Sequence, residues 1–426
     1  MNESNVLIIT YDMVPHSFTW GGCQRMYYLA KTLNDQGMNT HIFAVRKSPY
    51  NTFGMPELKN VHFVGGIDTE YKEQNETGDK KKNKAIEAVK WAVKKADRLF
   101  FNEIVDGKGL LAKRDCQIAR HAIIDLLRQN TFDVVIISGP PFAIFSLENL
   151  VRKLSKATIV LDYRDPWNLW HRGNILCTSR EKRLQKKSDW IICTNKYLCD
   201  EMSRKFNIPK EKYHDFPNGF SGEIPITEKT KKNIFSLVYA GSIDFTYKKG
   251  SYRNAENLMQ AFKNVINAGI GNIRIVFVGV ESLDDPNIQK IENELGQHVV
   301  IIGHVPTQKA KEYILESDAA LVLHTVNDES GKYLISGKVY DYIQCKKYIL
   351  SIGLNKGLHA RILNELGIGI NVENEVKQIE EGIKECYKKW CDNLLDSAYS
   401  DVDIEQFSRT NSMNRYSRFI SSIIKK

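Results

Sequence analysis

The chain has 426 residues, enough for two or three domains, because single cores rarely grow beyond roughly 250–300 residues. Apolar residues make up 42% of it and charged residues 26%, which excludes a disordered protein. No apolar run approaches the ~20 residues of a transmembrane helix, and the first residues show no basic segment followed by a long apolar one. We therefore expect a cytoplasmic protein. The net charge of +9 suits anionic ligands or an anionic membrane surface, and equally an ordinary basic surface.

The eight cysteines are scattered along the chain and form no C-x-x-C pair. Several of them fall inside strand or helix patterns. This distribution predicts reduced, mostly buried thiols rather than a disulfide framework or a zinc site.

The first half of the chain alternates short β-branched runs with longer amphipathic ones. We expect a first helix over 22–36, closed by Gly37, because its apolar residues recur at helical spacing. Strands that alternate with helices predict a parallel, doubly wound sheet. The expected strands of this half cover residues 6–10, 40–45, 133–138, 158–161 and 190–194.

Residues 71–84 form a polar run that predicts a mobile surface loop. The helix expected over 86–100 has an apolar stripe, with Lys90, Lys94 and Lys95 elsewhere on its surface. Such a helix either packs its stripe on the domain, which is the commoner case, or lies on a membrane. The stripe consists of Ile86, Val89, Val93, Ala96 and Phe100.

A second series of strands and helices begins near residue 237, after a stretch of low apolar content. The expected domains are 1–218 with a helical insert at about 66–130, a linker over 219–233, a second domain over 234–400, and a last helix within 401–426 that returns to the first domain. The expected strands cover 237–240, 273–278, 299–302, 319–326 and 348–352, and the expected helices 254–267, 307–316 and 411–424.

The segment SGKVYDYI, residues 336–343, lies between two of these apolar strands. A loop followed by a helix that opens on small residues and a lysine can bind a diphosphate through free backbone N–H groups and the helix dipole. Asp341 is then placed to accept a hydrogen bond from a sugar hydroxyl. An ordinary amphipathic helix with Val339, Tyr342 and Ile343 packed inward explains the segment equally well.

Two loops of the first half follow predicted strands and contain residues that could bind or react with a ligand. Gly21 and Gly22 would let a phosphate approach the backbone, although G-x-G-x-x-G is absent, which disfavours a nicotinamide cofactor. The loop 162–167 holds Arg164, which could anchor an acceptor, and Asp165, which could accept a proton. A purely structural Arg–Asp pair remains open there.

Two loops of the second half suit an anionic ligand. Gly241 and Ser242 follow a strand and lead into a basic loop, where Arg253 stands just before a helix. His304 follows the strand at 299–302, where a nucleobase could rest against the backbone, and we assign this histidine no catalytic role.

The chain resembles the retaining GT-B glycosyltransferases of family 4, in particular those that build bacterial surface polysaccharides. The resemblance covers about residues 5–420 and rests on pieces that occur in the family's order: WGGCQR, LAKTLNDQGMNTHIFAV, SGPPFAIF, VLDYRDPW, DFPNGF, LVYAGSI, IIGHVP and SGKVYDYIQCKKYILSIG.

The resemblance implies an α/β protein of GT-B fold, with two Rossmann-like domains whose parallel sheets face a central cleft. It implies a UDP-, GDP- or similar nucleotide-sugar donor in the second domain and an acceptor, a saccharide or lipid-linked saccharide, in the first. Asp341 would bind the donor ribose, and Gly337 and Lys338 would lie beside the diphosphate. Arg253, with Lys248 or Lys249, would match the family's basic phosphate contacts.

Three departures from the family pattern stand out. Eight residues before Asp341, where the family commonly has glutamate, this chain has Tyr333, and Glu329 is the nearest acidic residue upstream. The usual Gly-Arg after the first strand of the second domain is replaced by Gly241-Ser242, which shifts weight to Arg253. The histidine that the family frequently has in the catalytic loop is not evident after the strand at 158–161, where residues 162–165 stand instead.

These observations predict a metal-independent, retaining hexosyltransferase of bacterial glycan synthesis that needs no cofactor. The leaving diphosphate would itself take the proton of the acceptor hydroxyl. A nucleotide-sugar epimerase or hydrolase of the same architecture, or a non-catalytic scaffold, remains an alternative. Contact with an anionic membrane stays open, and the dispersed lysines argue against binding to nucleic acid.

The candidate residues are Asp165, Arg253 and Lys338 for catalysis; Gly21, Gly22, Gly241, Ser242, Lys249, Arg253, His304, Val305, Gly337, Lys338, Val339 and Asp341 for the donor; and Arg25, Arg164 and Trp167 for the acceptor.

Overall fold

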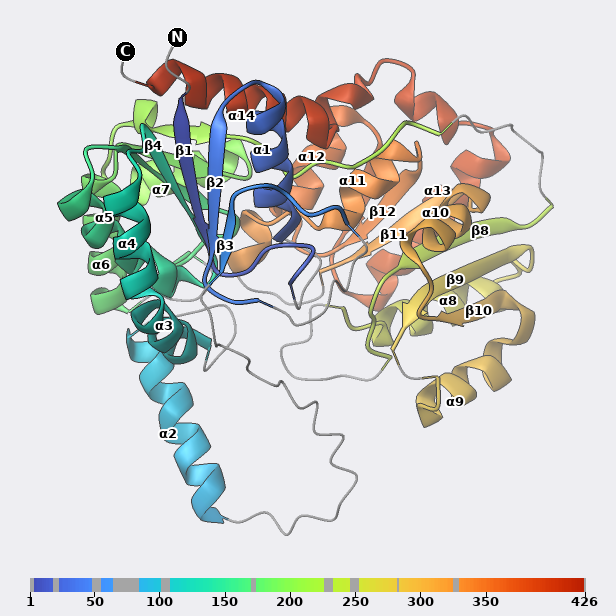
Figure 1. Ribbon diagram of the computed structural model, residues 1–426. Helices are drawn as coiled ribbons and strands as arrows, with labels where there is room; N and C mark the ends of the chain where they lie inside the picture. The colour runs from blue at the N-terminus through green and yellow to red at the C-terminus, as the bar shows by residue number, and fades with distance from the viewer. Residues whose placement is uncertain are drawn as a thin grey trace. The chain divides into compact units, whose positions relative to one another are not determined.

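The chain forms two compact units, unit 1 with residues 1–218 and 409–426, and unit 2 with residues 219–408. Each unit contains one parallel sheet flanked by helices (Figure 1). The computed structural model describes residues 4–17, 23–47, 55–63, 84–100, 108–169, 174–225, 233–245, 253–281, 283–324 and 329–424. The polar run predicted over 71–84 lies, except for Lys84, outside the described residues.

The sheet of unit 1 has seven parallel strands in the order β3-β2-β1-β4-β5-β6-β7. Its central strands are almost continuously apolar because helices cover both of their faces, and Ile8 of β1 lies opposite Ile42 and Ile136 of its two neighbours. The predicted parallel sheet is confirmed, and two short outer strands, β3 and β7, are added to it. The strands are β1 (Asn5–Thr10), β2 (Asn39–Ala44), β3 (Val61–Phe63), β4 (Val134–Gly139), β5 (Thr158–Tyr163), β6 (Trp190–Cys193) and β7 (Tyr213–Asp215).

The last helix of the chain, α14 (Arg409–Ile423), belongs to unit 1 and packs against α1 (Cys23–Asp35). It buries Met413, Tyr416 and Ile420 in the same apolar core as β1 and α1. The core of unit 1 is therefore completed by residues far along the chain. The other helices of this unit are α2 (Lys84–Phe100), α3 (Lys108–Ile118), α4 (Arg120–Gln129), α5 (Glu148–Leu154), α6 (Ile175–Lys187) and α7 (Lys196–Phe206).

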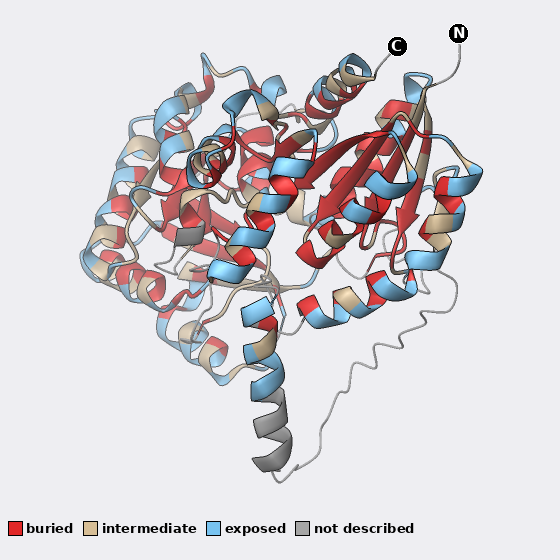
Figure 2. Ribbon diagram, turned by 90° about the vertical axis from the view of Figure 1, so that its left-hand side faces the viewer, coloured by how far each residue is buried: buried red, intermediate tan, exposed pale blue. Residues whose placement is uncertain are grey.

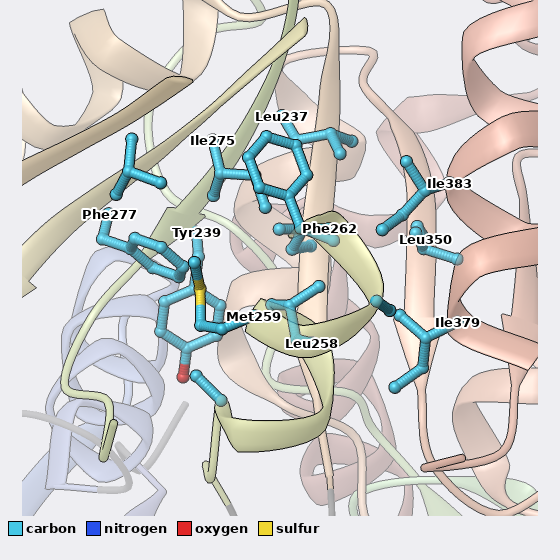
Figure 3. Close-up of a cluster of buried hydrophobic side chains, with 14 of the residues drawn as sticks. Leu237, Tyr239, Leu258, Met259, Phe262, Ile275, Phe277, Leu350, Ile379 and Ile383 are labelled. Carbon is cyan, nitrogen blue, oxygen red and sulfur yellow. The ribbon is translucent and has the colours of Figure 1, made fainter. Parts of the chain in front are cut away.

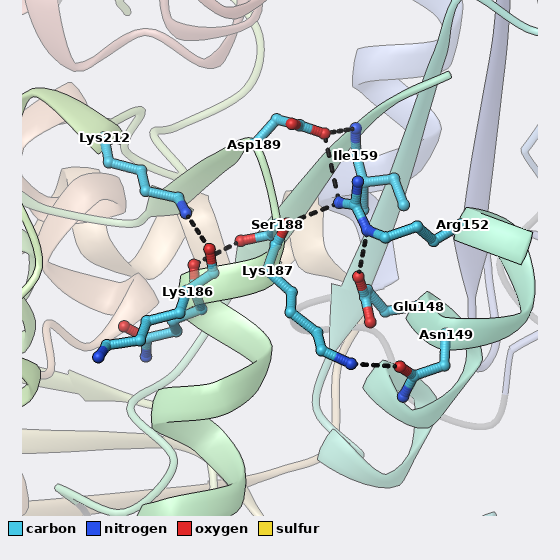
Figure 4. Close-up of polar contacts among 10 residues, drawn as sticks. Glu148, Asn149, Arg152, Ile159, Lys186, Lys187, Ser188, Asp189 and Lys212 are labelled. Carbon is cyan, nitrogen blue, oxygen red and sulfur yellow. Dashed lines mark hydrogen bonds and ion pairs between the residues drawn. The ribbon is translucent and has the colours of Figure 1, made fainter. Parts of the chain in front are cut away.

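A polar cluster connects α5, α6 and the strands between them in unit 1 (Figure 4). Arg152 donates from Nε to Glu148 Oε1 (2.8 Å) and from Nη2 to the Lys187 carbonyl (2.7 Å). Asp189 accepts from the Ile159 backbone N–H at 2.8 Å and lies 3.4 Å from Arg152 Nη2. The cluster satisfies polar groups at the start of β5 and the end of α6, and so fixes where β5 begins.

Unit 2 repeats the plan with six parallel strands in the order β10-β9-β8-β11-β12-β13. The strands are β8 (Phe235–Ala240), β9 (Ile273–Val280), β10 (Val299–Gly303), β11 (Ala319–Leu323), β12 (Tyr348–Ile352) and β13 (Gly369–Val372). The helices are α8 (Glu256–Asn267), α9 (Pro286–Leu295), α10 (Thr307–Glu316), α11 (Gly337–Gln344), α12 (Leu358–Leu366) and α13 (Val376–Cys391).

Helices α8 and α13 cover one face of the second sheet. Figure 3 shows Phe262 of α8 and Ile379 and Ile383 of α13 packed against Leu237, Ile275 and Leu350 of the strands. Tyr239 belongs to this cluster and is almost fully buried. Burial in both units is concentrated in the strands and on the inner helix faces, while the outer helix faces are exposed (Figure 2).

Several element boundaries differ from the sequence expectation by one to three residues, and three of them concern loops next to candidate residues. Strand β5 continues to Tyr163, so Asp162 is part of a strand rather than of a loop. Strand β11 ends at Leu323, three residues earlier than expected. Helix α8 begins at Glu256 instead of residue 254, because the Asn254 side chain accepts a hydrogen bond from the Glu256 N–H at 3.0 Å and thereby occupies a turn.

The expectation that helix α2 packs its apolar stripe inward is wrong for Val93 and Phe100, which are exposed. Asp97, which lies one turn from each of these two residues on the same side of the helix, is fully buried. The prediction of reduced, mostly buried thiols is confirmed: none of the eight cysteines forms a disulfide bond, seven of them are buried, and Cys391 is exposed. None of the helices in the described ranges is long and apolar enough to cross a membrane.

Candidate functional site

The most favourable place for a ligand in unit 2 is the edge where β8 and β11 end. Strands β9 and β10 continue the sheet to one side of β8, and β11, β12 and β13 to the other. The chain therefore reverses its direction of sheet building between β8 and β11, and open α/β sheets bind ligands at such a point. The loop that begins at Gly241 follows β8, and helix α11 follows β11.

Lys338, the second residue of α11, lies against the backbone of Gly241. A Cβ at Gly241 would come within 2.6 Å of Lys338 Cε, and Gly241 has a φ of +124°, which side-chain-bearing residues rarely adopt. The Lys338 ammonium lies 5.0 Å from the centre of the Tyr239 ring. Glycine at position 241 is thus required both by the backbone conformation and by the lysine that occupies the space of its missing side chain.

Burial dominates the electrostatics of Lys338. Burial and, to a smaller extent, the nearby Arg253 together lower the pKa of the ammonium from 10.5 to about 8, against an opposing effect of Asp341. A partly desolvated cation beside a second cation is stabilised by an anion. The electrostatics around Lys338 therefore favour the binding of an anion.

Arg253 joins this group from the other end of the loop after β8. Its guanidinium is exposed and donates to Ser242 Oγ. The loop itself is fixed, since Tyr239 Oη donates to the Ser242 carbonyl (3.0 Å) and the Gly241 N–H donates to the Val278 carbonyl (2.6 Å). Gly241, Ser242, Arg253 and Lys338, which the sequence assigns to a diphosphate, are therefore brought together.

Helix α11 both packs inward and presents a polar face, so the two interpretations of SGKVYDYI are compatible. Val339, Tyr342 and Ile343 are buried, whereas Gly337 and Asp341 are exposed. Space around Gly337 is open, since a Cβ there would meet nothing within 4 Å. Val339 can offer a ligand only its backbone. Asp341 lies on the polar face, near enough to Lys338 to raise the pKa of that lysine.

Two side chains that hold this site are not apparent from the sequence. Tyr342 Oη accepts a hydrogen bond from the Ala240 N–H at 3.0 Å, which ties α11 to the end of β8. His359 Nε2 accepts from the Ser336 N–H at 3.0 Å, directly before α11. Burial, with a smaller contribution from His324, lowers the pKa of His359 to about 3, so it stays neutral and can accept.

Other donor candidates are placed less centrally. His304 and Val305 follow β10, the edge strand, and His304 is exposed. Tyr333 is half-buried just before α11, after the short 3-10 helix Glu329–Lys332. The side chain of Glu329 and the residues Gly21, Gly22, Lys248 and Lys249 lie outside the described residues.

Arg25, expected to bind the acceptor, lies inside unit 1. Its guanidinium forms an ion pair with Asp162 at 3.0 Å, and both side chains are buried. Arg25 Nη1 also donates to the Phe216 carbonyl at 2.6 Å. Asp162 accepts further hydrogen bonds from Ser138 Oγ (3.0 Å) and Tyr416 Oη (3.2 Å). The buried pair of Arg25 and Asp162 therefore connects α1, β5 and α14.

The loop after β5 contains the remaining acceptor candidates. Arg164 is buried and donates to the Pro140 carbonyl. Trp167 is buried and stacks on Phe142 with ring centres 5.2 Å apart. Asp165 is half-buried, and burial raises the pKa of its carboxyl group although Arg164 opposes the shift.

A buried carboxylate that the sequence does not point to holds this loop. Glu181 Oε2 of α6 accepts from Asn168 Nδ2 (2.6 Å) and from the Asn168 N–H (3.2 Å). Burial raises the pKa of Glu181 to about 7. In the part of the chain that is described, no three histidine, cysteine or acidic side chains are grouped as metal ligands.

Comparisons with known proteins agree with this architecture. Residues 110–222 match the family described as Glycosyltransferase Family 4. Sucrose-phosphate synthase from Thermosynechococcus elongatus has a similar structure (TM-score 0.66, 10% identity, 99% of both chains covered). HepE from Anabaena in complex with UDP is also similar (TM-score 0.61, 11% identity, 98% of this chain and 100% of that one).

The apo form of the lipopolysaccharide outer core galactosyltransferase WaaB is another similar structure (TM-score 0.61, 11% identity, 98% of this chain and 99% of that one). The comparison with curated proteins gives no match. The two parallel-sheet units and these likenesses confirm the GT-B fold and the resemblance to GT-B glycosyltransferases.

Proposed function

We propose that the protein transfers a sugar from a nucleotide-diphosphate sugar to a hydroxyl acceptor, with retention of the anomeric configuration. The observation that carries the proposal is the pair of cations, Lys338 and Arg253, beside the Gly241 loop and the first turn of α11. The helix dipole and free N–H groups at that turn add to the positive potential. The group lies where the sheet reverses its strand order, the usual ligand position of such folds.

The reaction breaks the bond between the anomeric carbon and the diphosphate oxygen and forms one to the acceptor oxygen on the same face of the sugar. The electron pair of the broken bond stays on the diphosphate, where Lys338 and Arg253 stabilise the growing charge. The acceptor's proton passes to an oxygen of the departing diphosphate. No base from the protein and no metal are needed for this balance.

The donor is proposed to be a UDP-sugar. Support comes from HepE, a protein of similar fold that has been solved in complex with UDP and with UDP-glucose. Asp341 on the polar face of α11 is proposed to accept from the ribose hydroxyls, and His304 and Val305 to lie beside the base. Gly21, Gly22 and Lys249 stay proposed donor contacts on sequence grounds.

Unit 1 is proposed to bind the acceptor through the loop after β5. Asp165 is the side chain there that suits a sugar, since saccharides bind to carboxylates. Trp167, which is buried and stacked on Phe142, is proposed to support the loop rather than to touch the acceptor. Arg164 is proposed to anchor the loop through its hydrogen bond to the Pro140 carbonyl. Arg25 is proposed to support this region through Asp162 rather than to touch the acceptor. A cytoplasmic reaction in bacterial surface glycan synthesis is the proposed setting.

Turnover and thermal stabilisation should be measured with UDP- and GDP-sugars, together with product analysis. We expect stabilisation by one nucleotide class, and a loss of about 100–1000-fold in kcat for Lys338→Met and Arg253→Met, the usual effect of removing a group that stabilises transition-state charge. Lys356→Met, an exposed lysine of the same unit, is the matched control and should behave as wild type.

The same measurements separate the alternatives. Donor consumption without an acceptor, with a free or epimerised sugar as product, would replace transfer by hydrolysis or epimerisation. Stabilisation by a nucleotide without any turnover would favour a scaffold. Equal behaviour of Lys338→Met and Lys356→Met would remove the assigned site.

A further inference from the structure

Helices α2, α3 and α6 of unit 1 expose large apolar side chains to an unusual degree. Nine of the 13 exposed large hydrophobic residues in the described ranges belong to these three helices. Trp91 of α2 is 63% exposed and Ile175 of α6 is 84% exposed. Single exposed apolar residues are normal, but a concentration on three helices of one unit marks an interaction surface.

The three helices are joined, so these side chains belong to one region. The buried Asp97 of α2 accepts a hydrogen bond from the Leu110 N–H of α3 at 2.7 Å. The Leu99 carbonyl of α2 accepts from Asn174 Nδ2 next to α6 at 2.9 Å, and the Phe100 carbonyl accepts from Arg180 Nη1 at 2.5 Å. We name the exposed apolar side chains of α2, α3 and α6 the α2–α3–α6 surface.

Helix α3 shows that the apolar exposure is systematic. It turns the small side chains Ala112 and Cys116 inward and exposes Leu111 and Ile118, two turns apart on its outer side. An ordinary surface helix does the reverse and keeps its large apolar residues inside. Helix α2 repeats the arrangement, with Asp97 buried and Trp91 exposed.

The exposed charges among the described side chains of these helices have one sign. Among the described side chains of α2, α3 and α6, the acidic ones, Asp97, Asp115 and Glu181, are all buried. Exposed charges there are basic, including Lys94, Lys95, Arg114, Arg180 and Arg183. The Lys95 ammonium lies over the Trp91 ring, 4.8 Å from its centre.

We propose that the α2–α3–α6 surface binds an anionic lipid bilayer. Exposed Trp, Leu and Ile side chains enter the headgroup boundary, and the surrounding lysines and arginines bind lipid phosphates. A protein partner of opposite charge or a second copy of this chain is the competing occupant. The like charges of the described side chains disfavour a second copy, because a two-fold interface would bring these basic residues together.

The surface is connected to the loop after β5, which we propose to bind the acceptor. On the inner side of α6, the Cys177 carbonyl and Glu181 accept hydrogen bonds from the Asn168 side chain. The outer side of the same helix carries Ile175 and Leu176, both exposed. A bilayer at this surface lies one helix away from that loop. This arrangement suits a lipid-linked acceptor, an inference that rests on the proposed acceptor binding.

Vesicle binding tests the surface without any sugar donor, so it can fail or succeed independently of glycosyl transfer. The full chain is sedimented with vesicles of equal parts phosphatidylglycerol and phosphatidylcholine, and with phosphatidylcholine alone. We expect binding to the anionic vesicles that weakens with added salt. Lys94→Glu/Lys95→Glu should weaken it on the order of tenfold or more, since each basic residue near the surface contributes measurably. Trp91→Ser/Ile175→Ser should weaken it as well.

Matched controls lie on unit 2, where Lys377→Glu/Lys388→Glu and Leu394→Ser change exposed residues of the same kinds. They should bind vesicles as wild type does. All changed side chains are exposed, so folding is checked by an unaltered melting temperature. Equal binding by the surface variants and the controls, or equal binding to phosphatidylcholine alone, would overturn the proposal. A dimer in light scattering that Trp91→Ser/Ile175→Ser dissociates would overturn it in favour of a second copy.

Discussion

Lys338 is the residue on which the donor site depends. Its ammonium is partly desolvated beside Arg253, which is unfavourable in the protein alone and favourable once a diphosphate is bound. Functional groups are commonly kept in such environments at the expense of stability. The residue therefore links donor binding to the free energy of unfolding.

Replacing Lys338 by methionine should stabilise the protein while weakening donor binding. The pKa of this lysine falls from 10.5 in the unfolded chain to about 8 in the fold. Below pH 8 the charged form carries a cost, which we put at roughly 1–3 kcal/mol after allowing for partial exposure. Between pH 8 and 10.5 the unfolded chain binds more protons, so wild-type stability rises with pH there.

Urea unfolding at pH 7 and at pH 10 checks this expectation. The variant should be more stable than wild type at pH 7, and the difference should shrink at pH 10. A variant less stable than wild type at pH 7 would show that Lys338 is held by favourable contacts instead.

Gly241→Ala should damage the donor site through a single methyl group. The new Cβ would come within 2.6 Å of Lys338 Cε and would require a φ of +124°. The lysine must move, so we expect UDP affinity to fall at least tenfold, about 1.4 kcal/mol. Gly269→Ala, at a φ of +97° with nothing within 4 Å of the added carbon, shares the backbone strain without the clash. Equal UDP affinity in both variants would contradict this account.

At the scale of elements, α1, β5 and α14 are joined by the buried Arg25–Asp162 pair. Asp162 receives hydrogen bonds from Arg25, Ser138 and Tyr416, which come from three different elements. Removing one partner of such a pair leaves a buried charge without compensation. These contacts make Asp162 a structural residue of unit 1.

Asp162→Ala should therefore destabilise unit 1 by about 3–5 kcal/mol. Calorimetry measures the effect, with Asp35→Ala as the control because the Lys31–Asp35 pair is exposed and worth at most about 1 kcal/mol. UDP binding by the folded variant should be unchanged. A loss of UDP affinity without loss of stability would show instead that the pair serves the donor.

At the scale of the whole molecule, the sequence predicts the two parallel sheets well because buried strands are nearly continuous apolar runs. It also points to Gly241 and Ser242, directly after such a run, and to Arg253 and Lys338, which stand near the start of the helices that follow β8 and β11. Their meeting follows from the strand order, which places β8 beside β11. Local pattern and topology act together there.

What the sequence does not predict depends on contacts between distant residues. Arg25 and Asp162 are 137 positions apart, so nothing local shows that the arginine is paired and buried. His359 supports α11 from 23 positions beyond Ser336. The exposure of Val93 and Phe100 on α2 is not predicted because the same periodicity fits burial and exposure, and the buried residue beside them is the charged Asp97.

The central claim is that Lys338 binds the diphosphate, and proton uptake on UDP binding tests it most directly. Titration calorimetry in buffers of different ionisation enthalpy, from pH 7 to 9.5, gives both the affinity and the protons bound. Because the pKa of Lys338 is about 8 without ligand and a bound diphosphate raises it, wild type should take up a proton increasingly above pH 8 while its affinity declines. Lys356→Met should do the same, and Lys338→Met should take up none. UDP binding by Lys338→Met with wild-type affinity and an unchanged proton balance would contradict the account.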